Sequence, residues 1–136
     1  MKLSTVLTTL ALVAGPLAGF AQEAALMDCT VPTDTQAPVT LSISLTKETS
    51  ADYVMMTLTE SATASYTLFS QAEPGSVEQS LTAGNLNLMV LGEGFGLENG
   101  VIKDAGILSL SKDSSGAIEG MLLIKGNIYQ LSCQSK

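Results

Sequence analysis

Apolar and polar residues alternate along much of the chain, and a period of two is typical of strands with one buried and one solvated face. The alternation is most regular from Val39 to Leu45, where every second residue is apolar and the residues between are serine or threonine. Tyr53 to Thr59 repeats the pattern, and Ser65 to Phe69 is a shorter candidate. We therefore predict three strands in the first half of the chain.

The second half of the chain predicts four more strands. Leu86 to Leu91 is apolar at five of its six positions, which is typical of a strand buried on both faces. Ile107 to Ser111, Ala117 to Ile124 and Ile128 to Cys133 follow, joined by short connections rich in glycine, serine, aspartate and asparagine. The chain should therefore end in a three-stranded antiparallel meander.

Two segments between these strands are less regular. Ser76 to Ala83 fits a short helix, because Ser76 and Gln79 have the spacing of a capping box, but its alternation also fits a strand, so both remain open. Gly92 to Gly100 is punctuated by glycine and is predicted to be a loop.

Connections this short leave no room for crossover helices, so the fold class is all-β. We expect a small antiparallel β-barrel or a two-sheet sandwich of about seven to nine short strands. Residues 39–136 form the single β domain, and Gln22 to Pro38, with its prolines and no sustained period, is an extended lead-in.

The first residues have the order of a cleavable export signal. Lys2 precedes an apolar run that Gly15-Pro16 interrupts, and Gly19-Phe20-Ala21 offers small residues where a signal peptidase requires them. Residues 1–21 are therefore predicted to be removed. The mature protein is expected in the periplasm or outside the cell, with no membrane insertion.

Cys29 and Cys133 are the two cysteines of the chain, and an oxidising compartment would pair them. Because they enclose nearly the whole domain, the pair is expected to be a structural disulfide that joins the two ends of the chain.

Charge and composition narrow the function. The chain has 13 acidic residues against 6 lysines, one of which lies in the signal, and this acidity excludes nucleic acid as a partner. There is no histidine, and with both cysteines paired no thiol nucleophile remains. We therefore predict no catalytic residue, metal or cofactor, and a protein that is not an enzyme.

Two surfaces are candidates for binding. The glycine-rich segment and its surroundings carry Glu93, Phe95, Glu98 and Asp104, which we predict as a binding loop. Three of these are carboxylates, so a carboxylate-dependent hydrolase is a lower-ranked alternative that requires one of them to have a raised pKa.

The second surface follows from the Ala117 to Ile124 strand. Ile118, Leu122 and Ile124 share the face expected to be core, so Met121 and Leu123 lie on the other face. They could form an apolar interaction strip or be covered within the fold.

Ser115-Gly116-Ala117, Lys125-Gly126-Asn127 and Cys133 near the chain end resemble the C-terminal half of periplasmic inhibitors of C-type lysozyme. The likeness covers about 20 residues and lacks that family's aromatic residues between the two motifs, so the chain is not assigned to it. The resemblance implies a small disulfide-closed barrel that inhibits a hydrolase.

The sequence thus favours an exported binding module whose partner is an unknown protein or a small apolar ligand inside the barrel. A structural or self-assembling envelope or surface protein is the alternative. An open apolar interior would favour a carried ligand, and a filled one would favour binding at the surface.

Overall fold

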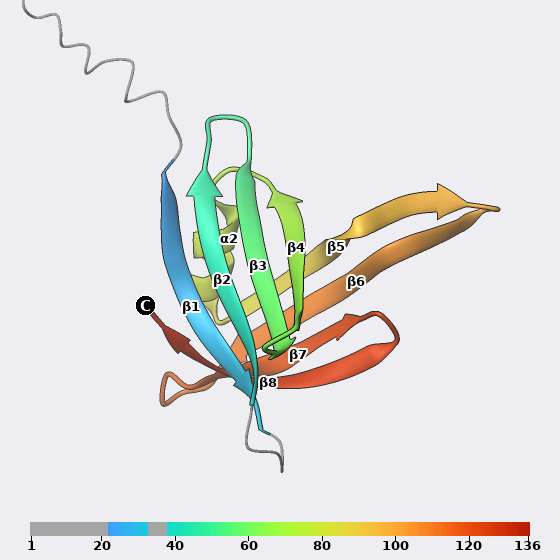
Figure 1. Cartoon of the computed structure of the whole chain (residues 1–136). Coiled ribbons are helices and arrows are strands. Elements are labelled where there is room, and N and C mark those ends of the chain that lie inside the picture. Colours follow the sequence, from blue (N-terminus) through green and yellow to red (C-terminus); the bar gives the residue numbers. More distant parts are fainter. Residues whose placement is uncertain (1–21, 33–37) are drawn as a thin grey trace, which may run out of the picture.

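The computed structural model of the chain describes residues 22–32 and 38–136. Within them, eight antiparallel strands close into a barrel in the order of the sequence, with one helix before the fifth strand (Figure 1). The all-β prediction is confirmed, and the barrel is the correct one of the two architectures. The elements are β1 (Glu23–Val31), β2 (Val39–Lys47), β3 (Asp52–Ser61), β4 (Ala64–Ala72), α2 (Ser76–Ala83), β5 (Asn85–Glu98), β6 (Val101–Lys112), β7 (Ile118–Ile124) and β8 (Asn127–Ser135).

In the first half of the chain, the alternating apolar and polar residues form the inner and outer faces of the barrel wall. In β2, the side chains of Leu41, Ile43 and Leu45 are buried, and the serines and threonines between them are more exposed. In β3, Val54, Met56 and Leu58 are buried in the same way, whereas Met55 faces outward. Figure 1 shows β1 to β4 running side by side, with β5 to β8 crossing them.

The barrel begins earlier than the sequence predicted. Glu23–Val31, predicted as part of a lead-in, is a full strand that pairs with β2 on one side and β8 on the other. Its period is hard to detect because only Met27 and Cys29 are fully buried and because a bulge between Ala25 and Met27 shifts the register.

In the second half, β5 differs from its prediction. Leu86, Leu88 and Val90 are buried, but Met89 is 68% exposed, so this strand has one dry face and not two. The meander of β6, β7 and β8 is confirmed. Lys125 and Gly126 form the turn between β7 and β8, both with positive φ, as a two-residue hairpin turn of type I′ requires.

The ambiguous segment Ser76–Ala83 is a helix, α2, between β4 and β5. Val77 anchors it in the barrel core. The buried carboxylate of Asp52 in β3 accepts hydrogen bonds from the backbone N–H groups of Gly75, at 3.1 Å, and Val77, at 3.4 Å. A carboxylate at this end favours the helix, because the first N–H groups of a helix have no partner within it.

Inward-facing side chains from all eight strands and from α2 occupy the barrel interior as one contiguous apolar cluster. Leu41, Val54, Leu58, Leu68 and Leu122 are among its fully buried members. Leucine, isoleucine, valine and methionine supply most of this volume, as the scarcity of aromatic residues predicts. The filled interior directs the search for a binding site to the outer surface.

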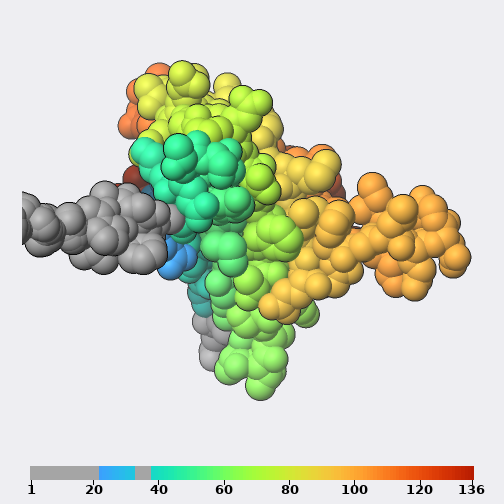
Figure 2. Space-filling model, turned by 90° about the horizontal axis from the view of Figure 1, so that it is seen from above, coloured from blue at the N-terminus to red at the C-terminus, as the bar shows by residue number. Residues whose placement is uncertain are grey.

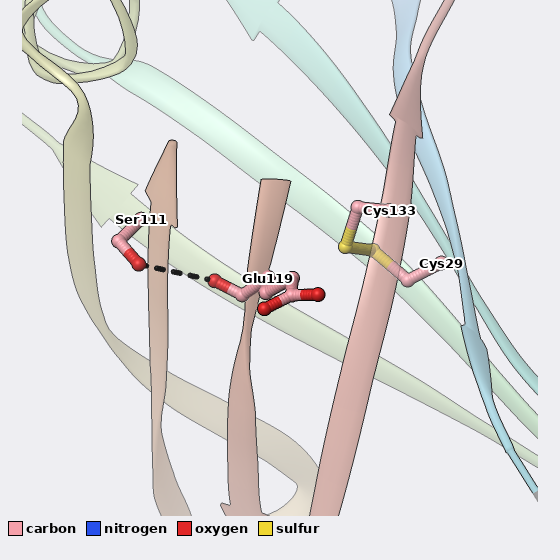
Figure 3. The surroundings of a disulfide bond; sticks show 4 residues. All are labelled: Cys29, Ser111, Glu119 and Cys133. Atoms are coloured by element: carbon pink, nitrogen blue, oxygen red, sulfur yellow. Dashed lines mark hydrogen bonds between the residues drawn. A yellow bond between two sulfur atoms is a disulfide. The ribbon is translucent and has the colours of Figure 1, made fainter. Parts of the chain in front are cut away.

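The disulfide joins the first strand to the last (Figure 3). Cys29 in β1 and Cys133 in β8 are directly opposite each other in the ladder that closes the barrel. Both half-cystines are buried, so the bond lies inside the wall and away from solvent. A neighbouring contact joins β6 to β7, where the Ser111 hydroxyl donates to the Glu119 carbonyl at 3.5 Å. The disulfide at the ends of the domain is confirmed.

The predicted export signal, residues 1–21, lies outside the described residues. Across residues 22–32 and 38–136, no helix has the length and apolar character needed to cross a membrane.

Candidate binding arm

The outstanding surface feature is a two-stranded ribbon that continues β5 and β6 beyond the barrel. The β4 strand pairs with β5 only at Leu91 and Gly92, and β7 pairs with β6 only from Ile107 onward. Residues 93–104 therefore leave the barrel wall, and we call them the arm. Figures 1 and 2 show the arm projecting to one side, well clear of the rest of the molecule.

The arm corrects the prediction of a loop over Gly92 to Gly100. The chain is strand up to Glu98, and its outer part forms a regular ladder in which Leu97 is opposite Ile102. Asn99 and Gly100 make the turn, with φ values of 52° and 77°, which is the type I′ geometry that suits the twist of a hairpin. Glycines that were interpreted as loop signals lie within β5.

The arm carries large apolar side chains that nothing else in the described structure covers. Phe95 is 49% exposed, Leu97 73%, Val101 61% and Ile102 62%. Leu97 and Ile102 share one face because they are opposite each other in the ladder. Exposed apolar side chains gathered on one projection are typical of a site that binds another molecule.

A carboxylate anchors the base of the arm. Asp104 Oδ2 accepts a hydrogen bond from the backbone N–H of Gly94 at 2.7 Å, and Oδ1 accepts one from Lys125 Nζ at 3.2 Å. The Asp104 carboxylate fills the space where a side chain at Gly92 would lie, and a Cβ at Gly94 would be only 3.1 Å from Oδ2. These two glycines are therefore needed so that Asp104 can cross to β5.

This position also explains the charge state of Asp104. The Gly94 N–H and the Lys125 ammonium both stabilise the carboxylate, so they hold the pKa of Asp104 below its usual value of 3.8. A carboxyl with a lowered pKa is ionised near neutral pH and cannot donate a proton there. The geometry thus favours a structural role for Asp104 over the acid that a hydrolase would need.

Lys125 links the arm to a polar cluster at this end of the barrel. Its ammonium lies 4.9 Å from the centre of the Tyr66 ring, a cation–π distance. Nearby, the largely buried Tyr129 hydroxyl donates to Glu60 at 2.6 Å and accepts from Asn127 at 3.3 Å. Burial and the Glu60 carboxylate raise the pKa of Tyr129 to about 12. The cluster joins the β3–β4 and β7–β8 turns beside the arm.

The structure separates the predicted loop residues into different roles. Glu93 and Phe95 lie on the part of β5 that leaves the barrel, and both are exposed. Glu98 lies near the tip and forms a 2.9 Å ion pair with Lys103 across the ribbon. Asp104 is at the base, so the four residues share the arm but do not form a single cluster.

The predicted strip of Met121 and Leu123 does face outward. Met121 is 40% exposed, and Leu123 is half-buried. Leu123 is opposite Ile107 on one side and Ile128 on the other, and Ile107 is opposite Met89. We call these four residues the apolar row: Met89, Ile107, Leu123 and Ile128. The row crosses four strands on the outside of the barrel, next to the root of the arm.

Sequence reasoning missed Leu97, Val101 and Ile102 as site residues. The signal was present, because an Asn-Gly pair between short apolar segments is a strong indication of a two-residue hairpin. The apolar row could not be found this way, since its members come from four strands and meet only through the register.

The described structure does not bring three or more histidine, cysteine, aspartate or glutamate side chains together in a group that could hold a metal ion.

No protein-family description, curated protein or solved structure matches this chain. The function has to be argued from the arm, the row and the charges of the molecule itself.

Proposed function

We propose that this chain is an exported, non-catalytic binding module that engages a protein partner through the arm. The observation that carries the proposal is the exposure of Phe95, Leu97, Val101 and Ile102 on a ribbon that projects from the barrel. A few large side chains that become buried near the centre of an interface commonly supply most of its binding energy. The disulfide between Cys29 and Cys133 is compatible with the oxidising compartment that export implies.

The arm is also prepared for binding by its rigidity. The type I′ turn, the Glu98–Lys103 pair and the Asp104 anchor all restrict its motion before a partner arrives. A surface ordered in advance loses less conformational entropy on binding. A partner protein is favoured over a small apolar ligand because core side chains occupy the interior of the barrel.

The test is site-specific photo-crosslinking in the host's extracytoplasmic fraction. A photoreactive residue at Leu97 is compared with one at Gln130, an exposed position on β8. We expect a defined protein product at Leu97 only, identified by mass spectrometry. The double variant Leu97→Ser, Ile102→Ser should then weaken binding of the purified partner about ten- to a hundredfold, as for truncated apolar anchors. Equal crosslinking at both positions, or unchanged affinity, would contradict the proposal.

The apolar row supports a second candidate function, self-assembly. Met89, Ile107 and Ile128 are each more than half exposed, and two copies could pack their rows face to face. Light scattering over a hundredfold range of concentration distinguishes this function. A dimer that Ile107→Ser converts to a monomer supports assembly through the row, and a monomer throughout contradicts it.

A further inference from the structure

The outer edge of β5 in the arm has no strand beside it in the described structure. Ladder pairing with β4 stops at Gly92, while pairing with β6 on the other side resumes at Gly96, after a register shift, and continues to Glu98. The Gly94 N–H is used by Asp104, but the other backbone N–H and C=O groups of Glu93 to Glu98 that point away from β6 have no partner strand in the described structure. Such an edge is a ready template for another extended chain.

The two edges of the arm are not equally protected. The β6 edge carries Lys103 and a residue with positive φ, Asp104, which breaks the regular strand. A lysine and an irregularity of this kind are the usual devices that prevent strand pairing. Between Gly94 and Leu97 the β5 edge has neither lysine nor proline, and none of its residues has positive φ. The register shift in β5 ends at Gly96, and from there to Glu98 the strand is regular. The unprotected edge is the one that carries Phe95 and Leu97.

Gly96 is the residue on this edge that the fold itself does not explain. A Cβ at Gly96 would meet nothing within 4 Å, and its φ is not positive. Gly92 and Gly94, in contrast, make room for Asp104. A bare glycine in an edge strand leaves a space that a large side chain on a neighbouring strand can cover, and aromatic residues do this best. Gly96 therefore favours an aromatic residue opposite it.

The charge of the arm indicates which kind of strand could pair with the β5 edge. Glu98 is paired with Lys103 and Asp104 with Lys125, so Glu93 is the arm carboxylate for which the described residues supply no ion-pair partner. The chain as a whole carries a formal charge of −7. A second copy would bring two acidic edges and two acidic molecules together, which is unfavourable. A basic segment would be attracted.

From these observations we propose that the arm binds by strand addition. The free edge of β5 pairs with an extended segment of another protein that carries an aromatic residue opposite Gly96 and a lysine or arginine close to Glu93. The inference rests on the proposed function of the arm and adds the binding mode and the chemistry of the partner. Backbone pairing supplies affinity in this mode, and the side chains supply specificity.

The experiment selects peptides from a random displayed nonapeptide library with the disulfide-bonded protein, residues 22–136. We expect enrichment of sequences with alternating apolar residues, one aromatic residue and at least one basic residue. Gly96→Val, which the open space allows, should weaken their binding at least tenfold. Thr57→Val, which places the same side chain at an exposed position of β3 outside the arm, is the matched control and should leave binding within about twofold.

A second readout reports the pairing itself. Only every second residue of an added strand turns its N–H toward the edge. N-methylation scanned along a selected peptide should therefore abolish binding at alternate positions and spare the residues between. The proposal would be overturned if the selected peptides lacked an aromatic or basic residue, or if no peptide were enriched. It would also be overturned if N-methylation abolished binding without alternation along the peptide, or if Gly96→Val bound the peptides as well as the wild type does. A protein dimer that Gly96→Val disrupts would overturn it too, and would identify a second copy as the occupant.

These outcomes are separable from failure of the proposed function. If a photoreactive residue at Leu97 crosslinks a partner, and Gly96→Val does not change the affinity for that partner, the arm binds the partner but not by strand addition. If Leu97 gives no specific product and no peptide is enriched, both proposals are wrong.

Discussion

The carboxylate of Asp104 occupies the position that a side chain at residue 92 would need, so Asp104 can hold this position only while residue 92 is glycine. The pair fixes the point where the arm leaves the barrel, because Asp104 then reaches Gly94 and Lys125.

The first prediction concerns this close approach. Gly92→Ala should lower the free energy of unfolding by about 1–3 kcal/mol, because Asp104 must move and give up its contacts. Gly96→Ala is the matched control, since both glycines have ordinary φ but Gly96 has open space around it, and it should leave stability unchanged or slightly raised. Urea denaturation of the two variants measures the difference. Equal stabilities would show that the Asp104 contact has no energetic role.

The second prediction concerns pH. The pKa of Asp104 is lowered in the folded protein, so its contribution to stability is present above the unfolded value near 3.8 and is lost as the pH falls through the lower folded value. We expect the amide order parameters of the arm to fall on acidification below about pH 4. In Asp104→Asn the arm should be less ordered already at neutral pH, and its order parameters should change little on acidification.

The control for this experiment is Asp113→Asn. The pKa of Asp113 is also lowered, by hydrogen bonds from Ser115 and Ala117, but it lies in the β6–β7 turn. The acid transition of the arm should persist in this variant, and its loss there would mean that the transition is not specific to Asp104.

The third prediction concerns Tyr129. Its pKa of about 12 is above the ordinary value of 10.0, so its contribution to stability is complete below pH 10 and is lost as the pH rises through 12. Tyr129→Phe should remove the tyrosinate absorbance that appears near pH 12, whereas Glu60→Gln should move that absorbance to lower pH. Tyr129→Phe should also cost about 1–2 kcal/mol at neutral pH, because Glu60 loses its donor. A titration unchanged in Tyr129→Phe would assign the high value to another group.

The fourth prediction concerns the disulfide. It closes a loop with a sequence separation of 104 residues. Removing such a link by Cys29→Ser with Cys133→Ser should lower the free energy of unfolding by about 4–5 kcal/mol, less any strain that the bond imposes. Chemical denaturation of the oxidised wild type and the double variant measures this difference. Comparable midpoints would show that the barrel seam is held by strand pairing alone.

The strands that could be predicted from the sequence are those in which alternation is carried by many residues, such as Val39 to Leu45. The strand β1 was assigned to a lead-in because only Met27 and Cys29 mark its inner face. The helix α2 stayed ambiguous because it has eight residues and only Val77 is buried.

The arm shows where local patterns are insufficient. Gly92 and Gly94 look like loop residues until Asp104, twelve and ten positions later, is placed beside them. The anchor is a tertiary contact, and so is the alignment of Met89 with Ile128 along the apolar row. The charged residues of the predicted loop could be named from the sequence. The pairing that exposes Leu97, Val101 and Ile102 at the tip depends on the hairpin register.

The closure of β1 against β8 has a consequence for how the barrel assembles. Seven of its eight strand pairs join neighbours in the sequence, so they can form as the chain collapses locally. The eighth pair brings together segments from opposite ends and closes the longest loop, so it has the largest loop-closure entropy of any single pair. Because Cys29 and Cys133 lie in that ladder, we expect them to oxidise after the other strand pairs have formed. Bond formation would then report completed folding, so a chain arrested as an open meander would keep both thiols accessible to alkylation.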